Sequence, residues 1–222
     1  MQKYVIIVAG GKGLRMGGEI PKQFLPLKDT PILMRTIQRF YEYDSLIKVV
    51  LVLPKDHFSY WKKLCDDYSF TVPCQLVEGG ESRYHSVKNG LLSIRPQEEA
   101  LVAVHDGVRP FVSVATLQKT FDMAEKYKTA IPVIESVDSL REIVNEKSVA
   151  RDRSKFFLVQ TPQVFSYDVI INAYQQAYRT IFTDDASVVE SSGYDIKLVE
   201  GNRENIKITT MYDLKIAEAL VE

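Results

Sequence analysis

Several residue types and patterns that mark whole classes of protein are scarce in this sequence. Its 222 residues include two cysteines, Cys65 and Cys74, which form neither a disulfide framework nor a zinc-binding pattern. It has no apolar run of about 18 residues, which a membrane-spanning helix would need. Positive and negative side chains balance, with 28 lysines and arginines against 29 aspartates and glutamates. These features predict a cytoplasmic protein with reduced thiols and with no nucleic-acid or membrane partner.

Two common phosphate-binding signatures are missing as well. The sequence contains no G-x-x-x-x-G-K-[S/T] P-loop. Its nearest approach to a dinucleotide fingerprint, residues 11–16, ends in Met16, where a small residue should pack helix against strand. This argues against an NAD-dependent oxidoreductase.

The most informative stretch is residues 4–27, YVIIVAGGKGLRMGGEIPKQFLPL. An apolar run at residues 4–9 predicts a buried strand. The glycines that follow it expose backbone amides, which can cradle an anion. Arg15 and Lys22 add cations suited to phosphate. We interpret the stretch as a loop that wraps a nucleoside triphosphate; the alternative is a flexible surface turn.

Apolar runs and helical periodicities alternate along the next hundred residues. A helix is expected after Thr30-Pro31, with Thr30 as its N-cap and Pro31 as its first residue. The other predicted strands and helices follow in turn: strands at residues 48–53, 75–77, 100–104 and 129–134, separated by helices. Alternation of this kind predicts an α/β fold, a Rossmann-like and mostly parallel sheet with helices on both faces.

Three loops at predicted strand ends combine glycine with charge: the first glycine loop, residues 79–83 and residues 105–110. In open parallel sheets, ligands bind beyond the carboxyl ends of the strands, so these loops should meet at one site. Asp106 is the candidate Mg²⁺ ligand, because one carboxylate plus substrate phosphates satisfies that ion. The alternative is an aspartate that caps its own turn. His105 has no ligand-type neighbour, which favours a structural role.

The alternating pattern breaks near residue 136. Residues 140–144 and 149–151 flank a polar turn, which predicts a β-hairpin standing off the sheet. A lone hairpin is only marginally stable in water, so it should rest on a partner subunit or fold back on its own domain. We therefore predict a single domain over residues 1–222 with a hairpin arm at residues 136–155.

Cations and glycines at strand ends suit phosphoryl or nucleotidyl transfer, in which catalysis is mainly positioning and charge neutralisation. An attacking phosphate is already anionic at neutral pH. The absence of an evident general base is therefore compatible with such a reaction.

A set of motifs spread over the whole chain resembles the sugar-phosphate cytidylyltransferases. The set comprises AGGKGLRMG…PKQFLPL, EGGESRYHSV, VHDGVRPF, VDSL with RDRS, QTPQ, TDDAS and NIKIT. The resemblance implies a Rossmann-like domain whose protruding β-arm interlocks two subunits in a homodimer. It also implies a Mg²⁺-dependent reaction that joins CTP to a sugar-alcohol phosphate and releases pyrophosphate.

The resemblance assigns a role to each matching residue. Arg15, Lys22 and Lys207 would be catalytic, the first two by stabilising the triphosphate and the charge that develops at its α-phosphorus. The nucleotide-binding residues would be Ala9, Gly10, Gly11, Gly13, Gly80, Glu81 and Ser86. The acceptor-binding residues would be Asp106, Arg109, Ser139, Arg153 and Thr183, with Asp106 also holding Mg²⁺ and with Ser139 and Arg153 supplied by the partner's arm.

The chain departs from the common family pattern in three places: Ala9-Gly10-Gly11, Gly107-Val108 and Ser139. The first two departures are more typical of family members that use ribitol phosphate. The RDRS and TDDAS motifs instead favour members that use methylerythritol phosphate in isoprenoid synthesis, and we adopt that prediction. A nucleotide-binding module without catalysis is the alternative from another class.

Overall fold

The computed structural model describes residues 1–11 and 20–221. Within this part, one eight-stranded sheet has the order β10-β7-β11-β6-β1-β4-β5, with β12 also paired to β7. The strands of this sheet are β1 (Gln2–Val8), β4 (Lys48–Leu53), β5 (Cys74–Glu78), β6 (Ala100–Asp106), β7 (Thr129–Glu135), β10 (Phe157–Val159), β11 (Gln163–Ser166) and β12 (Leu198–Glu200). The pairs that β1 forms with β4 and β6 are parallel, as are β4–β5 and β7–β12. The predicted α/β class and mostly parallel sheet are confirmed.

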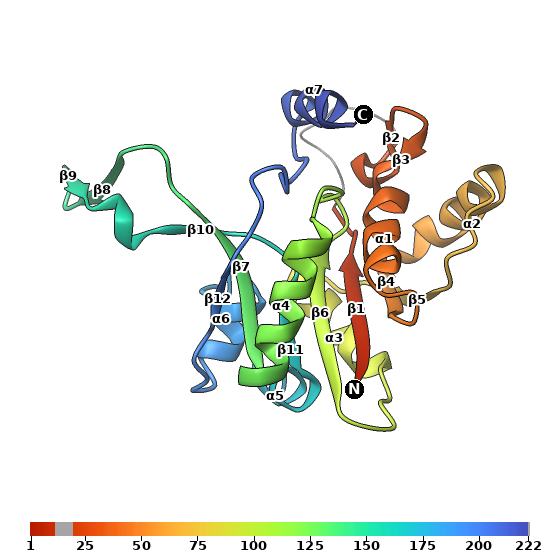
Figure 1. Cartoon of the computed structure of the whole chain (residues 1–222), viewed down its shortest axis with the longest axis horizontal. Coiled ribbons are helices and arrows are strands. Elements are labelled where there is room, and N and C mark those ends of the chain that lie inside the picture. The colour runs from red at the N-terminus through yellow and green to blue at the C-terminus, as the bar shows by residue number, and fades with distance from the viewer. Residues whose placement is uncertain (12–19, 222) are drawn as a thin grey trace.

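Helices cover both faces of the sheet (Figure 1). They are α1 (Ile32–Tyr43), α2 (Phe58–Asp67), α3 (Arg83–Ser93), α4 (Val114–Tyr127), α5 (Tyr167–Ala173), α6 (Asp185–Glu190) and α7 (Met211–Leu220), with 3-10 turns η2 (Lys22–Phe24), η3 (Lys55–His57) and η4 (Arg153–Lys155). Successive side chains of a strand point to opposite faces, and β1 shows the result. Val5 and Ile7 pack in the cluster with α1, α2 and α4, whereas Tyr4 and Ile6 pack in the cluster with α3 and α5.

The strand order places a topological switch point at the centre of the sheet. The chain leaves β1 through α1 and reaches β4 on one side, and it later returns to β6 on the other side of β1. The carboxyl ends of β1 and β6 lie level, because Val8 is registered with Asp106. Loops that leave these two ends in opposite directions open a crevice between them.

A hairpin leaves the sheet after β7 and projects away from the body of the chain (Figure 1). Its strands β8 (Leu140–Val144) and β9 (Lys147–Arg151) pair only with each other, and every residue of β9 is exposed. The predicted protruding hairpin is therefore present. Its role as a dimerisation arm stays a prediction.

One local prediction was wrong, and one strand was not predicted. Thr30 does not cap α1, because Thr30 and Pro31 (β3, Thr30–Pro31) pair with β2 (Pro26–Leu27), so the helix begins at Ile32. Strand β11 was not predicted, since it is short and polar at both ends. It lies between β6 and β7 and runs antiparallel to both. No helix of the described ranges is long and apolar enough to cross a membrane.

Candidate active site

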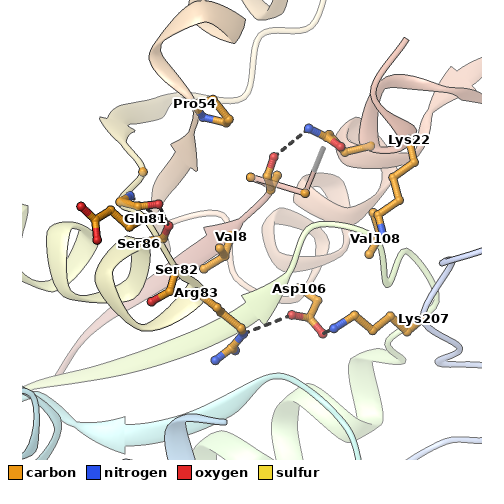
Figure 2. A pocket seen from close by; sticks show the side chains of 16 residues that line it. Val8, Lys22, Pro54, Glu81, Ser82, Arg83, Ser86, Asp106, Val108 and Lys207 are labelled. Carbon is orange, nitrogen blue, oxygen red and sulfur yellow. Dashed lines mark hydrogen bonds and ion pairs between the residues drawn. The ribbon is translucent and has the colours of Figure 1, made fainter. Parts of the chain in front are cut away.

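A cavity of about 600 Å³ opens at the carboxyl ends of β1, β4, β5 and β6 (Figure 2). We call it the central cavity. Its walls combine bare backbone with charged side chains, and the lining residues are Val8, Ala9, Gly10, Gly11, Lys22, Gln23, Pro54, Gly79, Gly80, Glu81, Ser82, Arg83, Ser86, Asp106, Val108 and Lys207. The three strand-end loops predicted to meet do meet here.

Two hydrogen bonds fix the backbone where the first glycine loop leaves β1. Ala9 N donates to Val52 O at 3.0 Å, and buried Gln23 Nε2 donates to Ala9 O at 2.7 Å. Pocket space begins at Gly10 and Gly11, where the nearest atoms to an added Cβ would be 3.9 and 3.5 Å away. Contacts with the described residues therefore do not require glycine at these two positions, whereas a ligand lying against the backbone would. Gly13 and Arg15 lie outside the described residues.

The second loop is held by Ser86, which comes from the first turns of α3. Gly80 N donates to Ser86 Oγ at 3.1 Å, and Gly79 N donates to Leu53 O at 2.8 Å. An added Cβ on Gly80 would lie 2.4 Å from the Cβ of His85, so only glycine fits there. This loop brings Gly80, the exposed Glu81 and the buried Ser86 to one wall of the central cavity.

Asp106, at the end of β6, is the electrostatic centre of the site. Its Oδ2 lies 2.9 Å from Lys207 Nζ and 3.4 Å from Arg109 Nε, and its Oδ1 lies 3.6 Å from Arg83 Nε. Burial by itself would raise the pKa of Asp106. The charges of Arg83, Lys207 and Arg109 outweigh burial and hold that pKa well below its usual range. The carboxylate is therefore ionised at neutral pH.

Lys207 and Arg109 reach Asp106 by different routes. Ile208 N donates to Val108 O at 3.0 Å, which fixes the segment carrying Lys207 beside the end of β6. Lys207 lines the central cavity and is half-exposed. Arg109 lies behind the cavity wall, largely buried, with its Nη1 donating to Asn205 O at 2.7 Å. Arg109 thus braces Asp106 in this structure and does not line the cavity.

His105 is fully buried behind Asp106. Its Nδ1 is 3.0 Å from Thr161 Oγ1, which accepts from Asp106 N at 3.2 Å, and its Nε2 is 3.0 Å from Arg109 O. Because a carbonyl oxygen only accepts, Nε2–H is the donor to Arg109 O. In the neutral ring Nδ1 is then the acceptor, and the Thr161 hydroxyl donates to it. Burial lowers the pKa of His105 to about 4. Neutral His105 therefore fixes the turn that carries Asp106.

Besides Arg109, three other predicted acceptor-binding residues do not line the central cavity of their own chain. Ser139 and Arg153 are exposed on the hairpin arm, where Arg153 Nη1 donates to Val137 O. Thr183 is exposed and lines a separate cavity of about 790 Å³ beside α6 and β12. Their roles stay predictions.

The sequence analysis did not single out one charged side chain that lines the central cavity. Arg83 was noted only as charge in the second loop, yet its guanidinium forms part of the wall of the central cavity and faces Asp106 (Figure 2). The available signal was its position at the start of a helix that directly follows the glycine pair Gly79-Gly80.

A basic cavity with bare backbone at the switch point of a parallel sheet is suited to a nucleotide and its phosphates. Comparison with known proteins narrows the class of protein. The family model for 2-C-methyl-D-erythritol 4-phosphate cytidylyltransferase matches residues 3–222. The chain belongs to that family, and its reaction is the family's, the transfer of a cytidylyl group to 2-C-methyl-D-erythritol 4-phosphate.

Individual relatives match this chain over all or nearly all of their own length. A protein of this name from Phocaeicola vulgatus is 53% identical over 221 residues, which cover 100% of both chains. One from Clostridium novyi is 38% identical over 98% of this chain and 95% of its own. The crystal structure of 4-diphosphocytidyl-2C-methyl-D-erythritol synthase from Anaerococcus prevotii matches with a TM-score of 0.85 at 29% identity, over 99% of this chain and 96% of that one. The prediction that methylerythritol phosphate is the acceptor is thus confirmed over the two alternatives, a ribitol phosphate acceptor and a nucleotide-binding module without catalysis.

Proposed function

We propose that the central cavity binds CTP with its triphosphate against Gly10, Gly11 and Lys22 and with its base and ribose toward Gly80, Glu81 and Ser86. A phosphate oxygen of methylerythritol phosphate attacks the α-phosphorus. The bond from that phosphorus to the bridging oxygen breaks, and pyrophosphate leaves. The reaction is the CTP-dependent step of the non-mevalonate isoprenoid pathway. The observation that carries the proposal is the ring of cations around one carboxylate at the switch point.

The residue charges fit a site for anions. Arg83 and Lys207 approach Asp106 from two sides (Figure 2), and Arg109 contacts it from behind the cavity wall. Lys22 lies beside Gly11 in the same cavity. Preorganised cations of this kind stabilise the charge that builds up at a reacting phosphorus without reorganising during the reaction. We assign that role to Lys22 and Lys207, together with Arg15. The attacking phosphate needs no general base, because it is already ionised.

The donor set also fits a Mg²⁺ ion that takes most of its ligands from CTP. Among the described residues, no group of three or more His, Cys, Asp and Glu side chains gathers to hold a metal. Asp106 offers one ionised carboxylate, and its Oδ1 has a single, long ion pair with Arg83. One carboxylate plus phosphate oxygens is a common Mg²⁺ environment. When bound, the ion would neutralise triphosphate charge.

Titration of CTP binding tests these assignments. We expect the wild-type protein to bind CTP more tightly with Mg²⁺ than with EDTA, and Asp106→Asn to lose most of that difference while still binding CTP. Lys119→Ala, which breaks a surface pair with Glu200, is a control that keeps the metal effect. Equal CTP affinity with and without Mg²⁺ in the wild type would contradict the metal assignment.

The hairpin arm is proposed to join two subunits. It and the adjoining β10 leave several large apolar side chains in water: Val137 is 58% exposed, Ile143 69% and Leu158 53%. Exposed apolar side chains clustered on a projecting element are typical of an interaction surface. Packed on a second copy, the arm would deliver Ser139 and Arg153 to the partner's acceptor site. Thr183, beside the separate cavity, and Arg109, through its contact with Asp106, are the other proposed members of that site.

Mixed dimers test this arrangement. Subunits carrying Lys22→Ala and subunits carrying Arg153→Ala are each expected to be nearly inactive. After subunit exchange, a mixed dimer would contain one cavity free of both substitutions, and activity should return. No recovery despite proven exchange would mean that each arm serves its own chain. The cytoplasmic location stays a prediction.

A further inference from the structure

Arg83 has a supporting structure of its own. It is the first residue of α3, after Ser82, which caps the helix by accepting from His85 N. Its Nη2 lies 2.6 Å from Asp185 Oδ2, and its Nε lies 3.6 Å from Asp106 Oδ1. The guanidinium is thus held between a carboxylate at the start of α6 and a carboxylate at the end of β6. Burial by itself would lower the pKa of Arg83, but the charges of Asp185 and Asp106 raise it, so the group stays charged.

Asp185 is completely buried, which is costly for a carboxylate unless it is paired and hydrogen-bonded. Two groups satisfy it. One oxygen accepts from Arg83, and the other accepts from the hydroxyl of Tyr174 at 2.6 Å. Tyr174 is itself 1% exposed and stacks on the ring of Tyr84 with centroids 4.7 Å apart. Tyr174, Asp185 and Arg83 therefore form a chain of contacts, the Tyr174–Asp185–Arg83 chain, that runs from the core to the central cavity.

The geometry determines where the free edge of Arg83 points. A guanidinium is planar and carries five N–H donors in a fixed fork, so holding Nη2 and Nε also fixes the direction of Nη1. Within the described ranges, Nη1 has no hydrogen-bond acceptor, while the side chain is 30% exposed and lines the central cavity. The free donor edge is thus available to a ligand in that cavity.

We propose that Arg83 is a further substrate-binding residue, which donates to a phosphate oxygen in the central cavity, and that Asp185 and Tyr174 are positioning residues that hold it there. The proposal rests on the function given above, since that function supplies the phosphates. They come from two sources, CTP and the acceptor. The chain of contacts also explains why a carboxylate is buried at this position: removing its charge would release the guanidinium toward solvent.

Kinetics with single and double variants test the proposal. A hydrogen bond to a charged group contributes roughly 1.5–3 kcal/mol, so Arg83→Ala is expected to lower kcat/KM by about 10- to 100-fold. A rise in the dissociation constant of CTP assigns the contact to the nucleotide. A rise only in the KM for methylerythritol phosphate assigns it to the acceptor. Tyr174→Phe, which removes one hydroxyl, is expected to change the same constant by about 3- to 10-fold.

The double variant separates positioning from general destabilisation. If Tyr174 acts through Arg83, adding Tyr174→Phe to Arg83→Ala lowers activity no further. Tyr84→Phe is the matched control. It lies in the same aromatic cluster, but its hydroxyl bonds to the carbonyl oxygens of Tyr174 and Gln176, so it should lower stability and leave the kinetic constants unchanged.

Arg83→Ala leaves the Asp185 carboxylate buried without its cation. If this single variant does not fold, it is replaced in the assays by the double variant Arg83→Ala with Asp185→Asn, in which both charges are removed. An unchanged kcat/KM in Arg83→Ala, or an equal loss from Tyr174→Phe with and without Arg83, would overturn the proposal. The wild type is measured in the same assay. A silent wild type would instead contradict the proposed function.

Discussion

Lowering the pH from 7 to 5 should destabilise the folded protein through His105. Its pKa is about 4 in the fold, against an ordinary value of 6.5, because burial disfavours the imidazolium. Between these values the unfolded chain binds a proton that the folded chain does not. Stability from this group is therefore complete above pH 6.5 and is lost as the pH falls toward 4. The gap corresponds to about 3 kcal/mol in full and to about 2 kcal/mol at pH 5.

The measurement is urea-induced unfolding at pH 7 and pH 5 for the wild type and for His105→Gln. The variant loses contacts with Thr161 and Arg109, so we expect it to be less stable at both pH values. Its further loss between pH 7 and pH 5 should be smaller than that of the wild type by about 2 kcal/mol. Lys62→Gln, at an exposed position of α2, is the control and should keep the wild-type difference. Equal losses in wild type and His105→Gln would refute the reasoning.

Three other predictions concern substitutions of residues that line the central cavity. Lys22→Ala removes a preorganised cation and should lower turnover by at least about 100-fold with little change in the melting temperature; near-normal kcat would remove Lys22 from the catalytic set. Gly80→Ala forces a Cβ to within 2.4 Å of His85 and should destabilise the fold by about 1–3 kcal/mol in thermal unfolding. Among the described residues, an added Cβ in Gly10→Ala meets nothing closer than 3.9 Å, so this variant should fold normally but bind CTP more weakly in a titration. Normal CTP affinity in Gly10→Ala would mean that the triphosphate does not lie against this backbone.

The sheet and the location of the site could be predicted because both depend on patterns within short stretches of the sequence. The run at residues 4–9 is apolar throughout, as a strand buried on both faces must be, and β1 lies at the centre of the sheet. Glycine and charge after three such runs predicted loops that meet. Parallel strands carry their loops to a common edge, and residues 79–83 and Asp106 do lie in one cavity.

What could not be predicted depends on contacts between distant parts of the chain. Arg83 and Asp185 are 102 residues apart, and no local pattern shows that they pair. Acidic residues at the start of a helix such as α6 are favourable charges at its N-terminus. Asp184 does cap that helix, but its neighbour Asp185 turns inward to Arg83. Strand β11 was missed for a similar reason, since its position is set by pairing with β6 and β7 rather than by its own four residues.

The most direct test of the account is pyrophosphate release from CTP and Mg²⁺, run in parallel with methylerythritol 4-phosphate and with ribitol 5-phosphate as acceptors. We predict release with methylerythritol 4-phosphate and background with ribitol 5-phosphate. Release with ribitol 5-phosphate alone would contradict the acceptor while leaving the chemistry of the cavity in place. Silence with both acceptors, in protein that binds CTP, would contradict the central claim that this cavity catalyses cytidylyl transfer to methylerythritol phosphate.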